Sequence, residues 1–175
     1  MRDYEFTLKF SLPDASEDPS DYIEALYEAG CDDAVIGVGQ PGRIALNFTR
    51  TAKSAFEAAS SAMRDIRSAI PDAVLAEALP DFVGLTDVAD IAGFSRQNMR
   101  KLMLGNMSTF PIAVHEGKPA VWHLASVLIW LQQQQRPVDA VLLEIANATM
   151  TLNIAKEIGK LPGATLPKRI APLFA

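Results

Sequence analysis

The chain of 175 residues has few of the groups that bind metals or form covalent cross-links. It contains one cysteine, Cys31, and two histidines. A single thiol excludes an intrachain disulfide and a zinc site built from several thiolates, and it suits a reducing compartment. Because 49% of the residues are apolar and 21% are charged, the composition also excludes a disordered chain or a fibre.

Long apolar runs are absent as well. No segment approaches the roughly eighteen uninterrupted apolar residues that a membrane-spanning helix needs. Residues 1–6 carry charges where a secretory signal needs an apolar run. We therefore expect a cytoplasmic protein that has no membrane partner.

Basic residues are fewer than acidic ones, and 16 Lys and Arg against 21 Asp and Glu give a formal net charge of -5. Such acidity disfavours a nucleic-acid partner when the charge is spread evenly along the chain. The charge of this chain is spread unevenly: residues 1–83 hold 15 acidic and 7 basic side chains, residues 84–136 hold 3 and 5, and residues 137–175 hold 3 and 4. The acidic front should therefore lie away from any phosphates, and only the rear is suited to face them.

The hydrophobic periodicity of the front alternates between the strand and the helix period. Strands are expected over Tyr4–Leu12, Ala34–Val38, Arg43–Thr49 and Ala73–Leu79, and helices over Pro19–Ala29 and Thr51–Ile70. The order β-α-β-β-α-β predicts a ferredoxin-like sandwich, in which two helices cover one face of a four-stranded antiparallel sheet. This fold assigns no function by itself.

Beyond Pro80 the helix period dominates. Helices are expected over Thr86–Ala92, Ser95–Leu104, Val121–Gln135 and Pro137–Gly159, with a small hairpin near Phe110–Val114 and an irregular tail. The whole chain is thus predicted to be α+β. We expect an acidic domain over 1–81, a mostly helical domain over 82–135, and a C-terminal helix and tail over 136–175.

Two short helices joined by a tight turn are predicted over Gly84–Leu104. Thr86 can cap the first helix, Gly93 permits the left-handed residue of the turn, and Ser95 can cap the second helix. On the second helix Met99, Leu102 and Met103 recur at i, i+3 and i+4 and should point inward. This spacing is that of a helix-turn-helix.

The outward face of the second helix is polar and basic, since it carries Arg96, Gln97, Asn98, Arg100 and Lys101. Arginine can pair bidentately with guanine, and asparagine or glutamine with adenine, in the major groove of DNA. A helix with this face is what major-groove recognition requires.

Further motifs follow the helix-turn-helix: Phe110-Pro111, Val114, Gly117, Trp122-His123, and Val127 with Trp130-Leu131. Together with Ser95–Lys101, they make residues 84 to 132 resemble the MerR-like winged helix-turn-helix, and most of all its prophage-regulator and excisionase branch. The resemblance implies that the recognition helix enters the major groove and that the wing contacts the backbone or the adjacent minor groove. Our candidate DNA contacts are Ser95, Arg96, Gln97, Asn98, Arg100, Lys101, and on the wing His115 and Lys118.

The sequence departs from that family at three positions. The second wing proline is replaced by Ala113, the wing arginine after the tryptophan by His123, and the usual acidic residue of the next helix by Ser126. Sensing relatives carry this module at the N-terminus, whereas 83 residues precede it here. Their metal or drug sensing is therefore not expected, and we predict no cofactor.

Two other patterns have simpler explanations than catalysis. Gly37, Gly39 and Gly42 match G-x-G-x-x-G, but Pro41 and a strand pattern follow, so a hairpin turn is expected rather than a dinucleotide site. Cys31 is distant in sequence from both histidines, and Trp122 beside His123 should be a core anchor. No nucleophile elbow or phosphate loop stands out, so we expect no enzyme and no metal site.

An apolar stripe at alternating 4 and 3 spacing runs along the last helix, through Val141, Ile145, Ala148, Leu152 and Ala155. It predicts either a dimer seam or packing on the helix-turn-helix core. Two functions remain open. One is a DNA-binding transcriptional regulator that acts as a homodimer; the other is an antitoxin-like or adaptor protein whose acidic N-terminal domain binds a basic protein.

Overall fold

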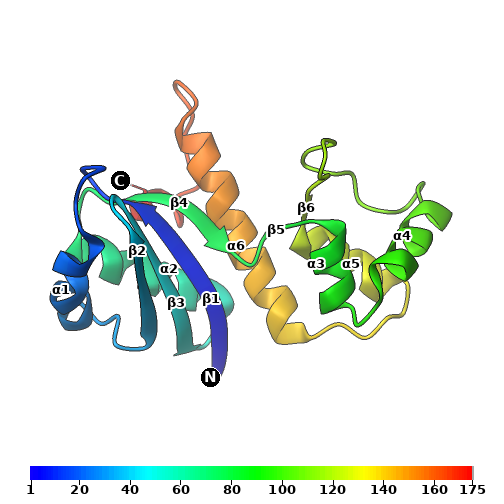
Figure 1. The fold of residues 1–175 in the computed structure, drawn as a ribbon, viewed down its shortest axis with the longest axis horizontal. Helices are drawn as coiled ribbons and strands as arrows, with labels where there is room; N and C mark the ends of the chain where they lie inside the picture. Colours follow the sequence, from blue (N-terminus) through cyan, green and yellow to red (C-terminus); the bar gives the residue numbers. More distant parts are fainter. Residues whose placement is uncertain (175) are drawn as a thin grey trace. The chain divides into compact units, whose positions relative to one another are not determined.

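The computed structural model describes residues 1–174, which form a mixed α+β protein with a four-stranded antiparallel sheet and six α-helices (Figure 1). Contacts divide the chain into two compact units. The first unit contains Met1–Leu79 and the segment from Thr151 onward, and the second contains Pro80–Met150. The sequence predicts boundaries after residues 81 and 135, whereas the contacts group the end of the chain with its beginning.

The first unit is built on four strands: β1 (Arg2–Ser11), β2 (Ala34–Gln40), β3 (Arg43–Ala52) and β4 (Val74–Leu79). They lie in the order β2-β3-β1-β4, and every neighbouring pair is antiparallel. From residue 4 onward the even-numbered side chains of β1 are buried, and those of Tyr4, Phe6, Leu8 and Phe10 are at most 2% exposed. The odd-numbered side chains lie on the opposite surface, which we call the open face of the sheet.

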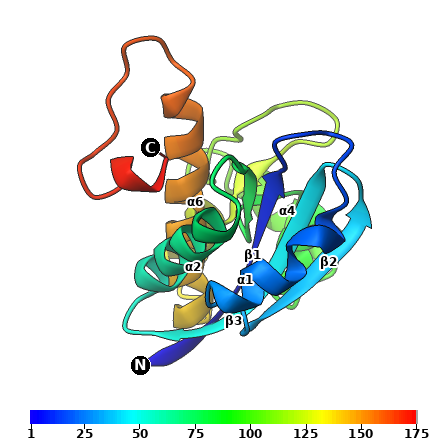
Figure 2. The same ribbon diagram turned by 90° about the vertical axis from the view of Figure 1, so that its left-hand side faces the viewer.

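Helices cover the buried face (Figure 2). A short 3-10 helix, η1 (Pro19–Tyr22), leads into α1 (Ile23–Glu28), and α2 is the longer helix Ala55–Ala69. The predicted single helix over Pro19–Ala29 is therefore wrong in its first turn, where Asp18 Oδ1 accepts from Ser20 N at 2.9 Å. The predicted start of α2 at Thr51 is also wrong, because β3 continues to Ala52 in pairing with β1.

An arginine cluster joins β3 to the helices. Arg50 is 8% exposed, and its guanidinium donates to Asp33 at 2.7 and 2.8 Å and to Asp65 at 2.6 Å. Burial opposes the charge, but the hydrogen bonds to Asp33 and Asp65 raise the pKa of Arg50 above its ordinary value. Burial also raises the pKa of the nearby Cys31 thiol to about 11, and Asp65 acts in the same direction. Cys31 is thus a protonated core residue at neutral pH.

The second unit contains two short strands, β5 (Phe82–Val83) and β6 (Trp122–His123), and the helices α3 (Leu85–Ile91), α4 (Arg96–Gly105) and α5 (Leu124–Gln133). The strands β5 and β6 pair antiparallel. Near the hairpin predicted around Phe110–Val114, the chain closes on itself through one antiparallel β-bridge between His115 and Val121. The β5–β6 pairing moves the start of α5 from Val121 to Leu124. The cause is tertiary, because β6 pairs with a strand about forty residues away.

The last long helix, α6, spans Ala140–Gly159. It does not begin at Pro137 as predicted, because Asp139 Oδ1 accepts from Val141 N at 2.8 Å and so caps the helix later. The stripe proposed as a dimer seam is largely buried in the single chain. The exposed fractions are 2% for Ile145, 5% for Ala148, 0% for Leu152 and 2% for Ala155. This stripe is therefore not an exposed seam.

Candidate nucleic-acid interface

The turn between α3 and α4 has the local geometry that the sequence predicts. Gly93 has φ +69°, and Phe94 N donates to the Ala89 carbonyl at 2.8 Å across the turn. Ser95 caps α4, since its Oγ accepts from Asn98 N at 3.2 Å. The predicted cap of α3 is wrong: the helix begins before Thr86, and the side chain of Asp87 instead accepts from the N–H of residue 84 at 2.7 Å.

The rotation of α4 is determined by one side chain. Met99 is fully buried and belongs to the same hydrophobic cluster as Val88 and Ala89 of α3. Leu102 and Met103 pack against the edge of this cluster. Since Met99 faces the core, the residues on either side of it in the sequence must point elsewhere.

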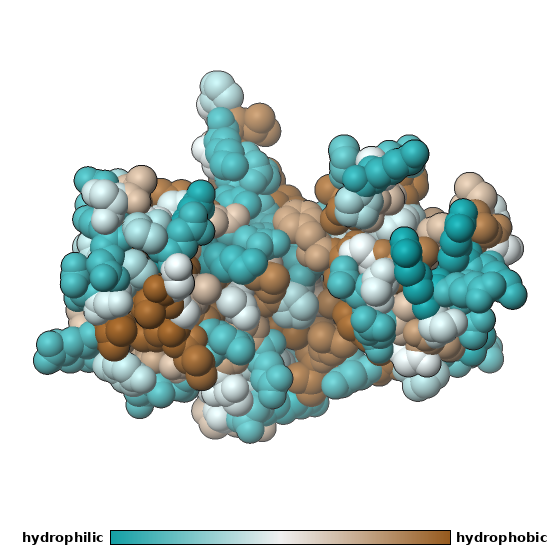
Figure 3. Space-filling view, in the orientation of Figure 1, coloured by the Kyte–Doolittle hydropathy of each residue, from teal (hydrophilic) through white to brown (hydrophobic). Residues whose placement is uncertain are grey.

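All six candidate residues on α4 and its cap are exposed, namely Ser95, Arg96, Gln97, Asn98, Arg100 and Lys101. Hydrophilic side chains protrude in this region of the space-filling view (Figure 3). The two sequence predictions for the helix, an apolar inner side and a polar outer side, are therefore confirmed as geometry.

Aromatic residues fix the segment that follows α4. The ring of Phe110 lies edge-on to Trp122 and Trp130, with centroids 5.8 and 4.9 Å apart. Trp122 Nε1 donates to the Pro111 carbonyl at 3.1 Å, and Trp130 Nε1 donates to Thr109 Oγ1 at 3.2 Å. Trp122 is 7% exposed, which confirms it as a core anchor. The loop above these rings is thereby held at both ends.

That loop, residues 111–121, is closed by a β-bridge between His115 and Val121. Val121 N donates to the His115 carbonyl at 3.0 Å, and Val114 N donates to the Val121 carbonyl at 2.8 Å. We call this loop the wing. Lys118 is exposed at its tip, whereas the exposed ring of His115 folds back onto Gly117, so closely that a side chain at 117 would clash with it.

A hollow of about 930 Å³ lies between α4 and the wing. Arg96 and Arg100 line it from α4, and Lys118 lines it from the wing. Asp87 is the one carboxylate in its lining, and one oxygen of that carboxylate is already bonded to a backbone N–H. The hollow therefore brings together three of the predicted site residues from two separate elements.

Asn98 and Lys101 line a second hollow, of about 430 Å³, on another side of α4. Arg136 joins them there, with its guanidinium 5.3 Å from the centre of the Phe94 ring. Sequence reasoning missed Arg136 because it lies in a linker, where no local pattern indicates its direction. His115 and Gln97 line neither hollow.

His123 is not part of this surface. Its Nδ1 lies 2.7 Å from Oδ1 of Asp81, a residue that is 1% exposed, and the Phe82 ring lies 5.3 Å away. The position that holds the wing arginine in the family that the sequence resembles is thus occupied by an internal polar pair. Asp81 was missed because its partner is 42 residues away.

The two structural units differ less in net charge than the front and the rear of the sequence do. The first unit has 15 acidic and 11 basic side chains, and the second has 6 and 5. The division into an acidic front and a basic rear fails because the basic tail folds with the front. The cations of the second unit still gather around α4 and the wing, and one of its carboxylates, Asp81, is buried.

The remaining predicted patterns have structural explanations. Gly37, Gly39 and Gly42 lie in the β2–β3 hairpin, where Gly42 has φ +70°, so the hairpin prediction is confirmed. Within residues 1–174, no three His, Cys, Asp or Glu side chains are placed to hold a metal ion. Nor is any helix of that range long and apolar enough to span a bilayer.

Comparison with known protein families, with curated proteins and with solved structures found no match to this chain.

Proposed function

We propose that the protein is a DNA-binding transcriptional regulator that places α4 in the major groove and the wing against the phosphate backbone. In this proposal the second unit is a winged helix-turn-helix of the MerR-like type, and the first unit is a ferredoxin-like sandwich. The single observation that carries the proposal is the hollow in which Arg96 and Arg100 of α4 converge with Lys118 of the wing.

The dimensions of α4 suit this role. Ten residues make a helix about 15 Å long, and the major groove of B-DNA is about 12 Å wide. Gln97 and Asn98 in the first turn, where recognition helices usually contact bases, can read base edges, while Arg96 and Arg100 can bind guanine or phosphate. Lys118 would then contact the backbone that borders the groove.

One copy offers few cations, so a single module should bind weakly. Arg96, Arg100, Lys101 and Lys118 are four cations. If each contacts one phosphate, the slope of log affinity against log salt is roughly -3.6 for one copy and about -7 for two. Two copies on half-sites about 34 Å apart would supply the missing affinity. We therefore propose that the regulator acts as a dimer.

The test starts from a pool of random DNA duplexes, from which the full chain selects its preferred sequence. Electrophoretic shifts at several salt concentrations then measure affinity for that duplex. Arg100→Ala should lower the affinity about tenfold or more, since one bidentate contact contributes about 1–3 kcal/mol. The matched control is Lys160→Ala, an exposed cation of the first unit. Absence of any sequence-dependent, salt-sensitive complex would refute the proposal.

A second candidate function is supported by the surface of the first unit. Six carboxylates and no cation occur in residues 14–28, and five of the six are exposed: Asp14, Asp18, Asp21, Glu24 and Glu28. Such a surface suits a basic protein partner, as in an antitoxin or adaptor. Capture of a stoichiometric basic protein from the native host, released by high salt and lost in a variant with these five residues neutralised, would favour this function.

A further inference from the structure

The two edges of the four-stranded sheet differ in how they are protected. At the β4 edge, Ala78 N donates to Asn153 Oδ1 at 2.9 Å and Asn153 Nδ2 donates to the Ala78 carbonyl at 2.8 Å. Lys156 Nζ donates to the Ala76 carbonyl at 2.7 Å on the same strand. Side chains of α6 thus take the place of a neighbouring strand. At the other edge, no described strand pairs with the outer side of β2.

The composition of β2 offers no protection either. Its sequence, Ala-Val-Ile-Gly-Val-Gly-Gln, contains no charged residue and no proline, the two devices that usually keep an edge strand from pairing. Val35 is 76% exposed and Val38 is 39% exposed. The space-filling view shows hydrophobic surface gathered over this strand (Figure 3). An uncharged, apolar edge is suited to pairing with another strand.

Backbone direction identifies the residue that faces the free edge. The Asp33 carbonyl accepts from Thr49 N at 3.1 Å, so Asp33 directs its backbone toward β3. Since directions alternate along a strand, Val35 and Gly37 also face β3, and Ile36 directs both its N–H and its carbonyl outward. A new strand would therefore pair first with Ile36.

We propose that β2 is a dimer interface, in which it pairs antiparallel with β2 of a second copy of this chain and Ile36 lies opposite Ile36. The two isoleucines would exchange two backbone hydrogen bonds about a two-fold axis. The sheet then continues across both copies with the helices of each on the same face. This inference depends on the proposed function in one respect only: DNA binding by a regulator of this kind requires two copies of the chain.

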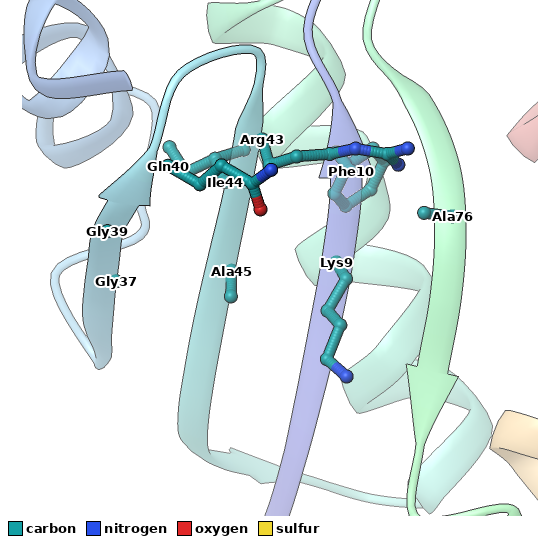
Figure 4. A pocket seen from close by; sticks show the side chains of 9 residues that line it. All are labelled: Lys9, Phe10, Gly37, Gly39, Gln40, Arg43, Ile44, Ala45 and Ala76. Atoms are coloured by element: carbon teal, nitrogen blue, oxygen red, sulfur yellow. The ribbon is translucent and has the colours of Figure 1, made fainter. Parts of the chain in front are cut away.

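Side chains on the open face complement one another in this register. Val35 of one copy lies opposite Gly37 of the other, which has no side chain to obstruct it. Beside Gly37 the open face has a hollow of about 680 Å³, lined by small residues such as Gly39, Ala45 and Ala76 (Figure 4). Val35 of the second copy would pack at the rim of this hollow.

The ends of the strand limit the length of the pairing. The ladder between β2 and β3 is irregular between Gly37 and Gln40, and Arg43 of the following turn donates to Ser11 Oγ on β1, so that it does not face the β2 edge (Figure 4). Pairing cannot extend past that turn, because its backbone is already bonded within the chain: Gly42 N donates to the Glu17 carbonyl at 2.8 Å, and Leu12 N donates to the Gly42 carbonyl at 3.0 Å. The contact is confined to about residues 33–39.

Sedimentation velocity of the full chain over a range of concentrations tests the proposal. The wild type should sediment as a dimer, and Val35→Lys as a monomer, because two lysines would lie about 7–8 Å apart on the same face. Val74→Lys is the matched control, since Val74 is 63% exposed on β4, the protected edge. It should remain dimeric. Circular dichroism of all three proteins establishes that they are folded.

A mixture of Val35→Lys and Val35→Glu should form a dimer that neither variant forms alone. Misfolded variants could not give this result. Three results overturn the inference: a monomeric wild type, as expected if β2 instead binds a foreign strand; a dimeric Val35→Lys; or an equal effect of Val74→Lys. Binding of Val35→Lys to a duplex with a single half-site separates the β2 dimer proposal from the DNA-binding proposal. If this monomeric variant still binds the duplex, the DNA-binding proposal stands even where the β2 dimer proposal fails.

Discussion

Arg50 in the first unit is 8% exposed and is bonded to the carboxylates of Asp33 and Asp65, whereas Arg96, Arg100 and Lys118 in the second unit are exposed. None of these three forms an ion pair with another residue in the described part of the chain. A buried cation that is paired with two carboxylates of its own chain has a structural role, because its charge is already neutralised. A cation that faces solvent beside other cations remains available for an external anion.

The largest expected effect is on the buried cation. Arg50→Ala should lower the free energy of unfolding by about 3 kcal/mol or more, because it leaves two carboxylates without their partner beside the core. Urea denaturation followed by circular dichroism measures this change. The exposed cation Lys53 serves as control, and Lys53→Ala should change stability by less than about 0.5 kcal/mol. Equal effects at both positions would contradict the distinction between structural and available cations.

A similar, somewhat smaller loss is expected in the core of the second unit. Met99→Ala should destabilise by about 2–3 kcal/mol, because it opens a cavity where α4 packs on α3. The melting temperature and the affinity for DNA should both fall. Leu104→Ala is the matched change on the same helix, and it should cost little because Leu104 is 51% exposed. Full stability of the Met99 variant would show that this side chain does not orient α4.

The turn between the helices should show a backbone effect of about 1 kcal/mol. Gly93→Ala forces a side chain into φ +69°, while no atom lies within 4 Å of the added methyl group. Its cost therefore comes from the backbone alone. At Gly105, which has open space and no positive φ, the same substitution should be neutral or stabilising. Chemical denaturation compares the two variants, and a stabilised Gly93 variant would be inconsistent with the turn geometry.

The smallest expected effect is at the tip of the wing. Lys118→Ala should leave stability unchanged and weaken binding several-fold for every sequence alike. It should also reduce the slope of log affinity against log salt by about 1 per copy, as expected for the loss of one phosphate contact. Anisotropy titrations at several salt concentrations measure the slope. A sequence-dependent loss would instead indicate that Lys118 reads a base.

Local patterns predicted well those elements whose cause is local. The alternation in β1 needs only a pleated strand with one buried face, and Ser95 caps α4 through a bond to an amide three residues later. The failures have distant causes. The continuation of β3 to Ala52 depends on β1, and the small β5–β6 sheet depends on residues about forty positions apart.

The site shows the same division. The exposed face of α4 follows from helical spacing once Met99 points inward, so its residues could be found in the sequence. Arg136 and the Asp81–His123 pair could not be found, since each lies beside groups that are remote along the chain. The apolar stripe of α6 illustrates the limit well. Its spacing is visible in sequence, but whether such a stripe packs within one chain or between two is decided only by folding.

What the sequence by itself determined is therefore the local geometry: the strand and helix periods, the turn at Gly93, the cap at Ser95 and the polar face of α4. The tertiary structure decided which charges are neutralised, which sheet edge is covered and where the basic tail belongs. The physical reason is that backbone preferences act over a few residues, whereas burial and ion pairing depend on which distant segments meet.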